Sequence, residues 1–207
     1  NFDQVDRLGV RIGDTVIVEK AGEIIPQVIR VVLEKRPKDA KPIKRPTKCP
    51  ECKGEVEQDE GGVYIRCIDP SCPAQIKERL TYFAGRDQMD IEGLGEVMVT
   101  KMVDKGWLHS VADLYDLPQR RDEIPLIEIE QERKTDGGVK ITMTQFGEKR
   151  TEKLLDGIEK SKGQPLARLL AALNIRHVGS ATAELLAEHF ESMSAILDAD
   201  ENSLVEV

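Results

Sequence analysis

Four cysteines are the residues of this chain whose spacing points most directly to a chemistry. Two residues separate the first pair, fourteen separate the two pairs, and four separate the second pair. Each pair sits on a short turn, so two thiolates can point at one ion, and the segment VYIR between the pairs predicts a returning strand. Four thiolates in tetrahedral geometry form a closed structural zinc site. The expected zinc ligands are Cys49, Cys52, Cys67 and Cys72.

Two other uses of four cysteines stay open on spacing alone. Two disulfides require an oxidising compartment, and no export signal opens the chain. Four cysteines also bind iron, although such sites usually repeat the two-residue spacing in both pairs. The module contains no histidine and no carboxylate that stands out as a general base, so we expect no chemistry at the metal. A module of this size has almost no core, so metal binding is expected to fold it.

Three segments resemble one another when they are aligned on a glycine, and they carry the second candidate chemistry. They are MDIEGLGEVMVTKMV around Gly95, ITMTQFGEKRTEKLL around Gly147 and LNIRHVGSATAELLA around Gly179. An apolar residue precedes each glycine, a small or β-branched residue follows four places later, and an apolar residue follows seven places later. This is helical spacing. The pattern predicts that each glycine opens a helix whose apolar face packs against a preceding helix.

A glycine turn before a helix can bind an anion through its backbone. Glycine permits positive φ and removes the side chain, so backbone N–H groups at the helix N-terminus point outward toward a phosphate. Such contacts ignore base identity and give non-specific binding to duplex DNA. These three segments therefore predict helix–hairpin–helix motifs. The alternative is an ordinary helical hairpin with glycine as punctuation, but three copies in phase disfavour it. Helical pairs that bind a protein instead remain a further alternative.

The three copies are unequal. Only the first has two glycines, Gly93 and Gly95, because Gln145 and His177 take the place of the first glycine in the other two. We therefore expect those two turns to bind phosphate less well. Basic residues lie near each turn: Lys101 by the first, Lys149, Arg150 and Lys153 by the second, and Arg176 and His177 by the third, where His177 is interpreted as a turn residue or phosphate neighbour. The expected DNA contacts of the three turns are Gly93, Gly95, Lys101, Gly147, Lys149, Arg150, Arg176 and Gly179.

Other segments predict how these sites are held. Residues 8–33 alternate as short strands with turn signals at Gly13-Asp14 and Ala21-Gly22, so they predict part of a small barrel. Residues 34–48 predict a basic, proline-containing linker that also suits phosphate contacts. The chain turns helical after residue 73, and residues 120–142 look inserted. That insertion predicts a hairpin that pairs IEIEQER with VKITM across 135–138.

Charge is uneven along the 207 residues. The whole chain has a net charge of −8, yet residues 1–48 carry 11 Lys+Arg against 7 Asp+Glu. The net charge therefore argues against DNA binding by bulk attraction, whereas it does not argue against phosphate binding by the backbone. Aromatic residues make up only 4%, which favours several small units over one large core. No stretch is long and apolar enough for a membrane span, so we expect no membrane association and a cytoplasmic location.

Taken in order, these features resemble the C-terminal half of a bacterial NAD-dependent DNA ligase. The segment RIGDTVIVEKAGEIIPQV is similar to the OB-fold signature of that family, with Glu23 where many members carry Asp. KCPECKGEV, YIRCIDPSCPAQIKERLTYF, MDIEGLGE and ALNIRHVGSATAELLAEHF resemble its zinc finger and its helix–hairpin–helix motifs. Signature positions matched in the OB-fold are Arg11, Gly13, Asp14, Lys20, Gly22 and Pro26.

The resemblance implies a multidomain α+β chain. We expect a truncated OB-fold β-barrel and basic linker at 1–48, a small four-cysteine zinc finger at 49–73, and a truncated, all-α helix–hairpin–helix domain at 74–207. It implies a monomer that clamps nicked double-stranded DNA in the bacterial nucleoid, with Arg11 and Lys20 as further DNA contacts. NAD and magnesium are implied for the complete enzyme but not for this chain, which lacks the adenylation domain and is expected to be inactive alone.

One motif is a decoy. Ligases carry their nucleotidyl lysine in K-x-D-G, and Lys134-Thr135-Asp136-Gly137 spells that string. Covalent catalysis would need a desolvated lysine with magnesium-binding carboxylates beside it, and none surrounds Lys134. We therefore expect no catalytic residue in this chain. The alternative to a ligase portion is a non-enzymatic DNA-binding or scaffold protein with a zinc ribbon and helix–hairpin–helix repeats.

Overall fold

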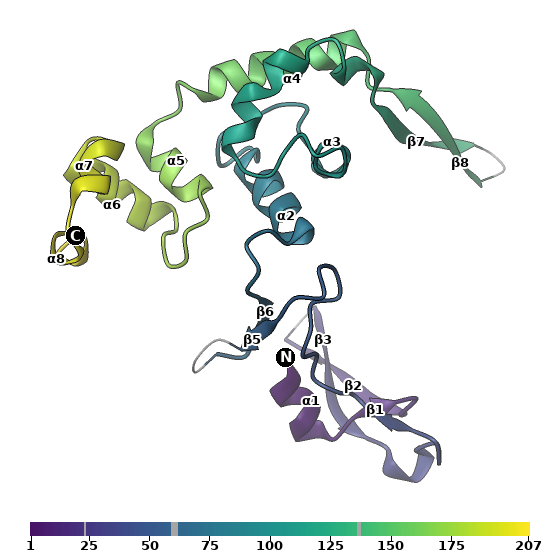
Figure 1. Ribbon diagram of the computed structural model, residues 1–207. Coiled ribbons are helices and arrows are strands. Elements are labelled where there is room, and N and C mark those ends of the chain that lie inside the picture. Colours follow the sequence, from purple (N-terminus) through teal and green to yellow (C-terminus); the bar gives the residue numbers. More distant parts are fainter. Residues whose placement is uncertain (23, 59–61, 136–137) are drawn as a thin grey trace. The chain divides into compact units, whose positions relative to one another are not determined.

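The computed structural model describes residues 1–22, 24–58, 62–135 and 138–207. It divides into two compact units, residues 1–72 and 73–207, which are described separately below (Figure 1). Three residues singled out in the sequence lie outside the described residues. They are Glu23, which differs from the OB-fold signature of the ligase family, and Asp136 and Gly137 in the turn of the expected hairpin. Within the described residues, no helix combines the length and the apolar character needed to cross a membrane.

The first unit is built from short elements. They are α1 (Phe2–Leu8), β1 (Arg11–Ile12), β2 (Val16–Ala21), β3 (Ile25–Val31), the 3₁₀ helix η1 (Leu33–Lys35), β4 (Lys41–Pro42), β5 (Val56–Gln58) and β6 (Ile65–Cys67). The strands pair antiparallel as β1–β4, β2–β3 and β5–β6. The β2–β3 hairpin is the one expected from the alternating sequence, and Gly22 supplies the positive φ of 66° that its turn requires.

The segment expected as a linker is in part structured. Lys41 and Pro42 return to pair with β1, and Arg36 makes a bidentate ion pair with Asp14, with N···O distances of 2.8 and 2.7 Å. Arg36 also donates to the carbonyl of Gly9, and the backbone N–H of Arg11 donates to Asp14. The Asp14 side chain has no exposed surface, and hydrogen bonding to Arg36 lowers its pKa. This ion pair holds the start of the basic tract against the turn before β2.

The β2–β3 hairpin buries little of its own apolar surface. Val31 is buried, but Val18 is 52% exposed and Ile25 is 67% exposed. A two-stranded ribbon with an open apolar face is marginal in water. This is the behaviour of part of a barrel, as the alternating pattern predicted.

The second unit is mainly helical. Its elements are α2 (Pro73–Phe83), α3 (Glu96–Asp104), the 3₁₀ helices η2 (Ala112–Arg120) and η3 (Ile124–Leu126), β7 (Glu128–Thr135), β8 (Gly138–Gln145), α4 (Glu148–Ser161), α5 (Leu166–Ala172), α6 (Ser180–Phe190), α7 (Met193–Asp198) and α8 (Glu201–Val205). A main core joins α2, α3, η2, η3 and α4, and a smaller cluster joins α5 with α6 and α7. Each of the three aligned glycines is therefore followed by a helix, as expected.

The helical spacing of the repeats is confirmed. The residues four places after the three glycines are all buried, and they are Val99, Thr151 and Ala183. Met102 and Leu154, seven places after the first two glycines, have no exposed surface, and Leu186 packs against the smaller cluster. The apolar face predicted from the sequence is therefore the face that builds both cores.

The second repeat differs from the prediction in what precedes it. The α6 helix follows α5 and α3 follows α2, but the segment before Gly147 is strand β8, which pairs with β7 over eight residues. The expected hairpin is confirmed. The segment from 120 is not only a surface addition, however, because Ile124 and Ile127 are buried in the main core. The two apolar residues enter the core because η3 brings the chain back to α4 before the hairpin begins.

The first glycine turn packs against α4. A Cβ placed on Gly157 in the middle of α4 would lie 2.9 Å from the backbone nitrogen of Glu92, and one on Gly93 would lie 3.5 Å from the Cβ of Leu154. The Lys153 ammonium lies 3.3 Å from the Glu92 carboxylate across the same contact. The backbone of the turn therefore lies directly on a helix surface that only glycine leaves open.

Replacement of Gly157 by alanine tests this contact. Alanine is the better helix former by about 1 kcal/mol, so an exposed site would be stabilised. At Gly157 the added methyl group must displace the turn, and overpacking of this kind costs about 1–3 kcal/mol. We expect a lower melting temperature by circular dichroism. Gly163→Ala is the matched control, because its Cβ would meet its nearest neighbour, the Lys160 carbonyl oxygen, at an ordinary 3.5 Å. Equal or higher stability of Gly157→Ala would contradict the close packing.

Candidate metal centre and phosphate-binding turns

Two turns of the first unit position the four cysteines. In the first turn the Cys49 N–H donates to the Gly54 carbonyl at 2.8 Å and the Lys53 N–H donates to the Cys49 carbonyl at 3.0 Å, with Lys53 at a φ of 62°. In the second, Ser71 donates to Asp69 from both its backbone and its hydroxyl, and the Cys72 N–H donates to the Asp69 carbonyl. Strand β6 carries Cys67 back beside the first turn.

The four sulfur atoms converge on one point. All four Sγ atoms lie within 4.8 Å of one another, with Cys49 to Cys72 at 3.9 Å and Cys52 to Cys67 at 3.5 Å. A tetrahedron with Zn–S bonds of about 2.3 Å has edges of about 3.8 Å. The sulfur spacing therefore fits a zinc ion at the centre, and all four cysteines are free rather than disulfide-bonded.

The ionisation of the thiols also favours a cation. Backbone N–H groups of Cys52 and Glu51 lower the pKa of Cys49 to about 7. The N–H of Gly54 acts in the same direction on Cys52, but burial and the neighbouring thiols raise the pKa of Cys52 to about 12. A thiolate forms readily at Cys49, whereas Cys52 resists ionisation because it is buried beside the other thiols and like charges would share a small volume. A divalent ion removes that repulsion, so the donor set suits structural zinc with no open position.

The three aligned glycines each cap a helix without a side-chain acceptor. Gly95, Gly147 and Gly179 are the N-cap residues of α3, α4 and α6, and no side-chain hydrogen bond caps any of the three. Their carbonyls accept from Val99, Thr151 and Ala183 at 3.0, 3.1 and 2.9 Å. The N–H groups of the first turn of a helix have no partner within the helix, so these three ends present backbone donors to an anion.

Residues before the capping glycine set the turn. Gly93 has a φ of 90°, and His177, at the equivalent place in the third turn, adopts a φ of 68°. The left-handed conformation is therefore kept without glycine, although weaker phosphate binding by the third turn stays a prediction. In the second turn Gln145 ends a strand and Gly147 itself takes the positive φ of 82°. The first and third turns share one geometry, and the second has another.

Side chains near the turns differ in charge. Lys149 and Arg150 are exposed in the first turn of α4, and the Arg150 guanidinium lies 5.9 Å from the Phe146 ring. Lys101 is half-buried and lies in the last turn of α3, whereas Gly95 caps the start of that helix, so Lys101 adds no charge beside the first turn. Glu96 and Glu148 occupy the first position of α3 and α4, whereas Ser180 begins α6. Exposed Arg176 precedes the third turn.

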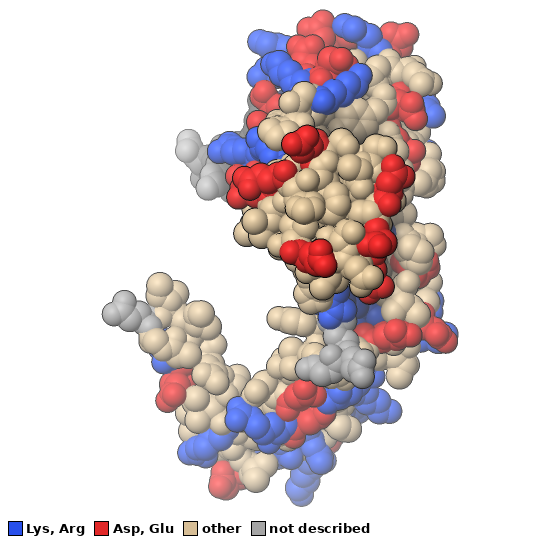
Figure 2. All heavy atoms as spheres, turned by 90° about the vertical axis from the view of Figure 1, so that its left-hand side faces the viewer, with Lys and Arg blue, Asp and Glu red and all other residues tan. Residues whose placement is uncertain are grey.

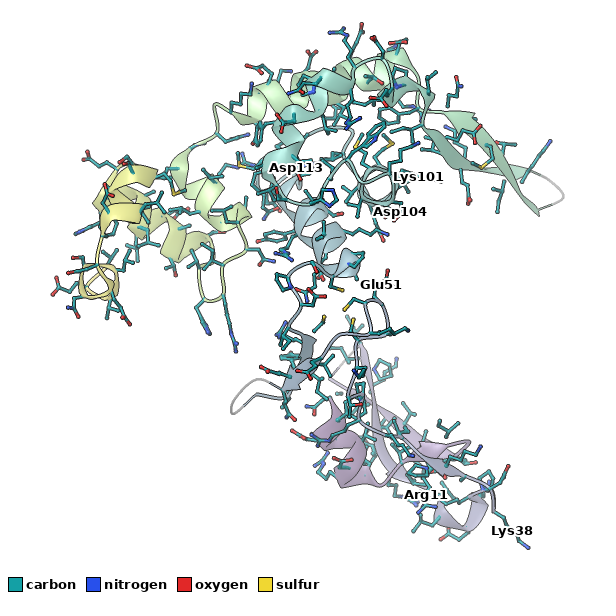
Figure 3. The ribbon with its side chains drawn as sticks, viewed as in Figure 1. Arg11, Lys38, Glu51, Lys101, Asp104 and Asp113 are labelled. Atoms are coloured by element: carbon teal, nitrogen blue, oxygen red, sulfur yellow. The ribbon has the colours of Figure 1, made fainter. Side chains whose placement is uncertain are left out.

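The basic tract of the first unit is partly engaged. Arg36 binds Asp14, and Arg45 donates to Asp3, Asp6 and Gln58. The lysines of the tract are exposed, and they are Lys35, Lys38, Lys41, Lys44 and Lys48. Arg11 and Lys20 are exposed on β1 and β2, and Arg11 lies with Lys38 at one end of the unit (Figure 3). Lysines rather than arginines are thus the groups of this tract available to a phosphate.

The surface also shows where an anion is disfavoured. No Lys or Arg follows Arg176, while seven acidic residues do. The acidic side chains over the C-terminal helices are visible in Figure 2.

The sequence did not predict that Gly157 supports the first turn, because a single glycine within a helical pattern does not indicate which distant segment packs against it. The sequence also did not predict that Arg36 and Arg45 form ion pairs within the first unit, with Asp14 and with Asp3 and Asp6 respectively.

Three family models match the chain. They describe the NAD-dependent DNA ligase OB-fold domain at residues 1–40, the NAD-dependent DNA ligase C4 zinc finger domain at 48–74, and the helix–hairpin–helix motif at 168–207. The chain is therefore an α+β protein with an OB-fold portion, a four-cysteine zinc finger and a helix–hairpin–helix segment. The expected family resemblance and the expected structural zinc are confirmed.

Curated relatives match along the whole chain. The DNA ligases of Rhodopirellula baltica and Symbiobacterium thermophilum are 43% and 44% identical over 207 residues, covering all of this chain. The DNA ligase of Bacillus thuringiensis is 41% identical over 204 residues, or 99% of the chain. These matches cover 28–29% of the relatives, so the chain spans less than a third of their length.

Loss of one cysteine is expected to unfold the zinc module and leave the second unit folded. Cys49→Ser removes a ligand whose Sγ lies within 4.8 Å of the other three, and binding worth about 10–16 kcal/mol in comparable peptides is what orders such a module. We expect one zinc per wild-type chain by native mass spectrometry and none in the variant. Hydrogen exchange is expected to rise across residues 49–72 and to stay unchanged in α3 and α4, whose core is separate. Protection of 49–72 in zinc-free protein would refute a structural role.

Proposed function

We propose, from the similarity of the whole chain to one portion of the NAD-dependent DNA ligases, that it is the portion that grips nicked duplex DNA while the complete enzyme joins a 5′-phosphate to a 3′-hydroxyl. The observation that carries the proposal is the set of three helices capped by glycine without a side-chain acceptor. NAD and magnesium act in the complete enzyme, and no residue of this chain is assigned to either.

The grip rests on backbone donors. At Gly95, Gly147 and Gly179 the uncapped N–H groups and the positive end of the helix dipole face a phosphate. Lys149 and Arg150 add charge at the second turn and Arg176 adds charge at the third. Backbone contacts to phosphate carry no sequence information. A ligase must seal nicks in any sequence, so this form of recognition suits it.

The zinc ion serves the grip indirectly. Its four ligands, Cys49, Cys52, Cys67 and Cys72, leave no open coordination position, so it holds residues 49–73 in one conformation and takes no part in the chemistry. We assign residues 1–48 to the OB-fold portion with its basic tract and 74–207 to the helix–hairpin–helix domain. The chain acts as a monomer in the bacterial cytoplasm, at the nucleoid.

Alanine at the capping glycines tests the proposed grip. Gly95 and Gly179 both have a φ of −86°, and a Cβ at either would meet nothing within 4 Å. Each variant is therefore expected to fold with a loss of about 1 kcal/mol or less. The methyl group would occupy the place of an approaching phosphate oxygen. We expect the affinity for nicked duplex, measured by fluorescence anisotropy, to fall about tenfold, or about 1.4 kcal/mol, for each variant.

Gly163→Ala serves as the control, because Gly163 lies beyond the end of α4 and caps no helix start.

The double variant Lys149→Ala with Arg150→Ala is expected to weaken DNA binding equally for different DNA sequences. It is also expected to reduce the salt dependence of the affinity by the equivalent of about one to two phosphate contacts. Unchanged affinity of both Gly95→Ala and Gly179→Ala, with wild-type melting temperatures, would contradict binding through the turns.

The chain alone is expected to form no covalent adduct with AMP. Incubation with labelled NAD and magnesium, followed by denaturing gel electrophoresis, is expected to leave the protein unlabelled. The K-x-D-G string at 134–137 begins in the last two residues of β7, outside the three segments that the family models match, and a four-letter string with one free position is a weak signal. Labelling that disappears in Lys134→Ala would overturn this assignment and make the chain an enzyme in its own right.

A further inference from the structure

The β7–β8 hairpin is a ribbon with one covered and one open face. Its register is continuous from Glu128↔Gln145 to Thr135↔Gly138, and in the described sheets no third strand pairs with it. At its base the Phe146 N–H donates to the Ile127 carbonyl at 2.8 Å, which ties the ribbon to the main core. In Figure 1 the ribbon extends away from the helices of its unit.

The alternation of the strands assigns residues to the two faces. Ile129 is buried and its partner Thr144 is half-buried, so this face turns toward the core at the base of the ribbon. The neighbouring positions lie on the opposite face. There Glu128 and Glu130 are exposed on β7, while Ile141 is 59% exposed and Met143 is 52% exposed on β8. Glu130 stands directly opposite Met143 in the ladder.

The open face therefore combines an acidic row with an apolar row. Stable domains cover the apolar face of a sheet with a second layer, and no such layer covers this face in the described residues. The carboxylates disfavour DNA, because a phosphate backbone would face like charge. They also disfavour a second copy of the same face, since Glu128 and Glu130 would meet their own counterparts.

We propose that the open face of the β7–β8 ribbon, formed by Glu128, Glu130, Ile141 and Met143, docks a basic amphipathic helix of a protein partner. The apolar stripe of such a helix covers Ile141 and Met143, and Lys or Arg at the stripe's edge pairs with the two carboxylates. Burial of the two apolar side chains supplies the affinity, and the charges fix the orientation.

The test uses the 207-residue chain labelled with ¹⁵N and a synthetic leucine–lysine peptide of about five helical turns, with leucines along one face. A peptide with glutamate in place of lysine is the matched probe. We expect the basic peptide to shift the backbone amide signals of 128–130 and 141–145, and the acidic peptide to leave them in place.

Two double variants separate the contributions. Glu128→Gln with Glu130→Gln removes the charges and keeps the shape, and Ile141→Thr with Met143→Thr removes the apolar row and keeps strand propensity. Each double variant is expected to lower the affinity for the basic peptide at least fivefold. The controls are Glu201→Gln with Glu206→Gln, both exposed on or after α8, and Leu126→Thr, at a residue that is 62% exposed outside the ribbon. All controls are expected to bind as the wild type does.

Three results would overturn the proposal. One is peptide binding that neither ribbon variant weakens, which would reflect the overall negative charge of the chain. Another is a shift by nicked duplex DNA of the amide signals of Glu130 and Ile141, which lie farther along the ribbon from the Gly147 turn than Glu128 and Gln145 do, because such a shift would make the open face a DNA contact. The third is broadening of the ribbon amides that grows with protein concentration, which would assign the face to a second copy of this chain.

Discussion

A helix that begins at glycine leaves its first backbone N–H groups without a side-chain acceptor, and the capacity of the second unit to bind an anion depends on that omission. Serine, threonine, asparagine or aspartate at the same position would accept from the helix and fill the site. Gly95, Gly147 and Gly179 do not, so the donors must be satisfied by water or by an anion. The cores beneath Val99, Thr151 and Ala183 hold these three ends in place.

Uncapped helix ends explain how a chain of net charge −8 suits an anionic polymer. Fixed backbone dipoles act over a few ångströms, whereas bulk charge is screened beyond about 8 Å at physiological salt. Local charge then decides which turn is favoured. Glu96 places a carboxylate at the start of α3, whereas the second turn adds Lys149 and Arg150, and the third begins with Ser180 after Arg176. The turn with two glycines is thus not the turn with the most favourable charge.

Local patterns in the sequence were enough to predict the cysteine cluster, the glycine-capped helices, their buried faces and the β7–β8 hairpin. Each depends on spacing within a short segment, where period and turn chemistry are strong. Contacts between distant segments were not predicted. Arg36 on Asp14 and the 2.9 Å approach of Glu92 to the Gly157 Cβ position depend on tertiary packing that no local pattern encodes. The strand before Gly147 was predicted as part of the hairpin, but the aligned repeat also implied a preceding helix for the second motif, and that expectation was wrong.

The two units solve the problem of small size in different ways. In the second unit, aliphatic side chains such as Leu108, Leu114 and Leu154 are fully buried, so hydrophobic burial holds the turns. Among the described residues of 49–72, only Cys49 and Cys72 are buried. There the metal replaces the core, because four thiolates held by one ion fix both turns of the module at once. A site with this task needs a closed coordination shell, since an open position would add reactivity without adding order.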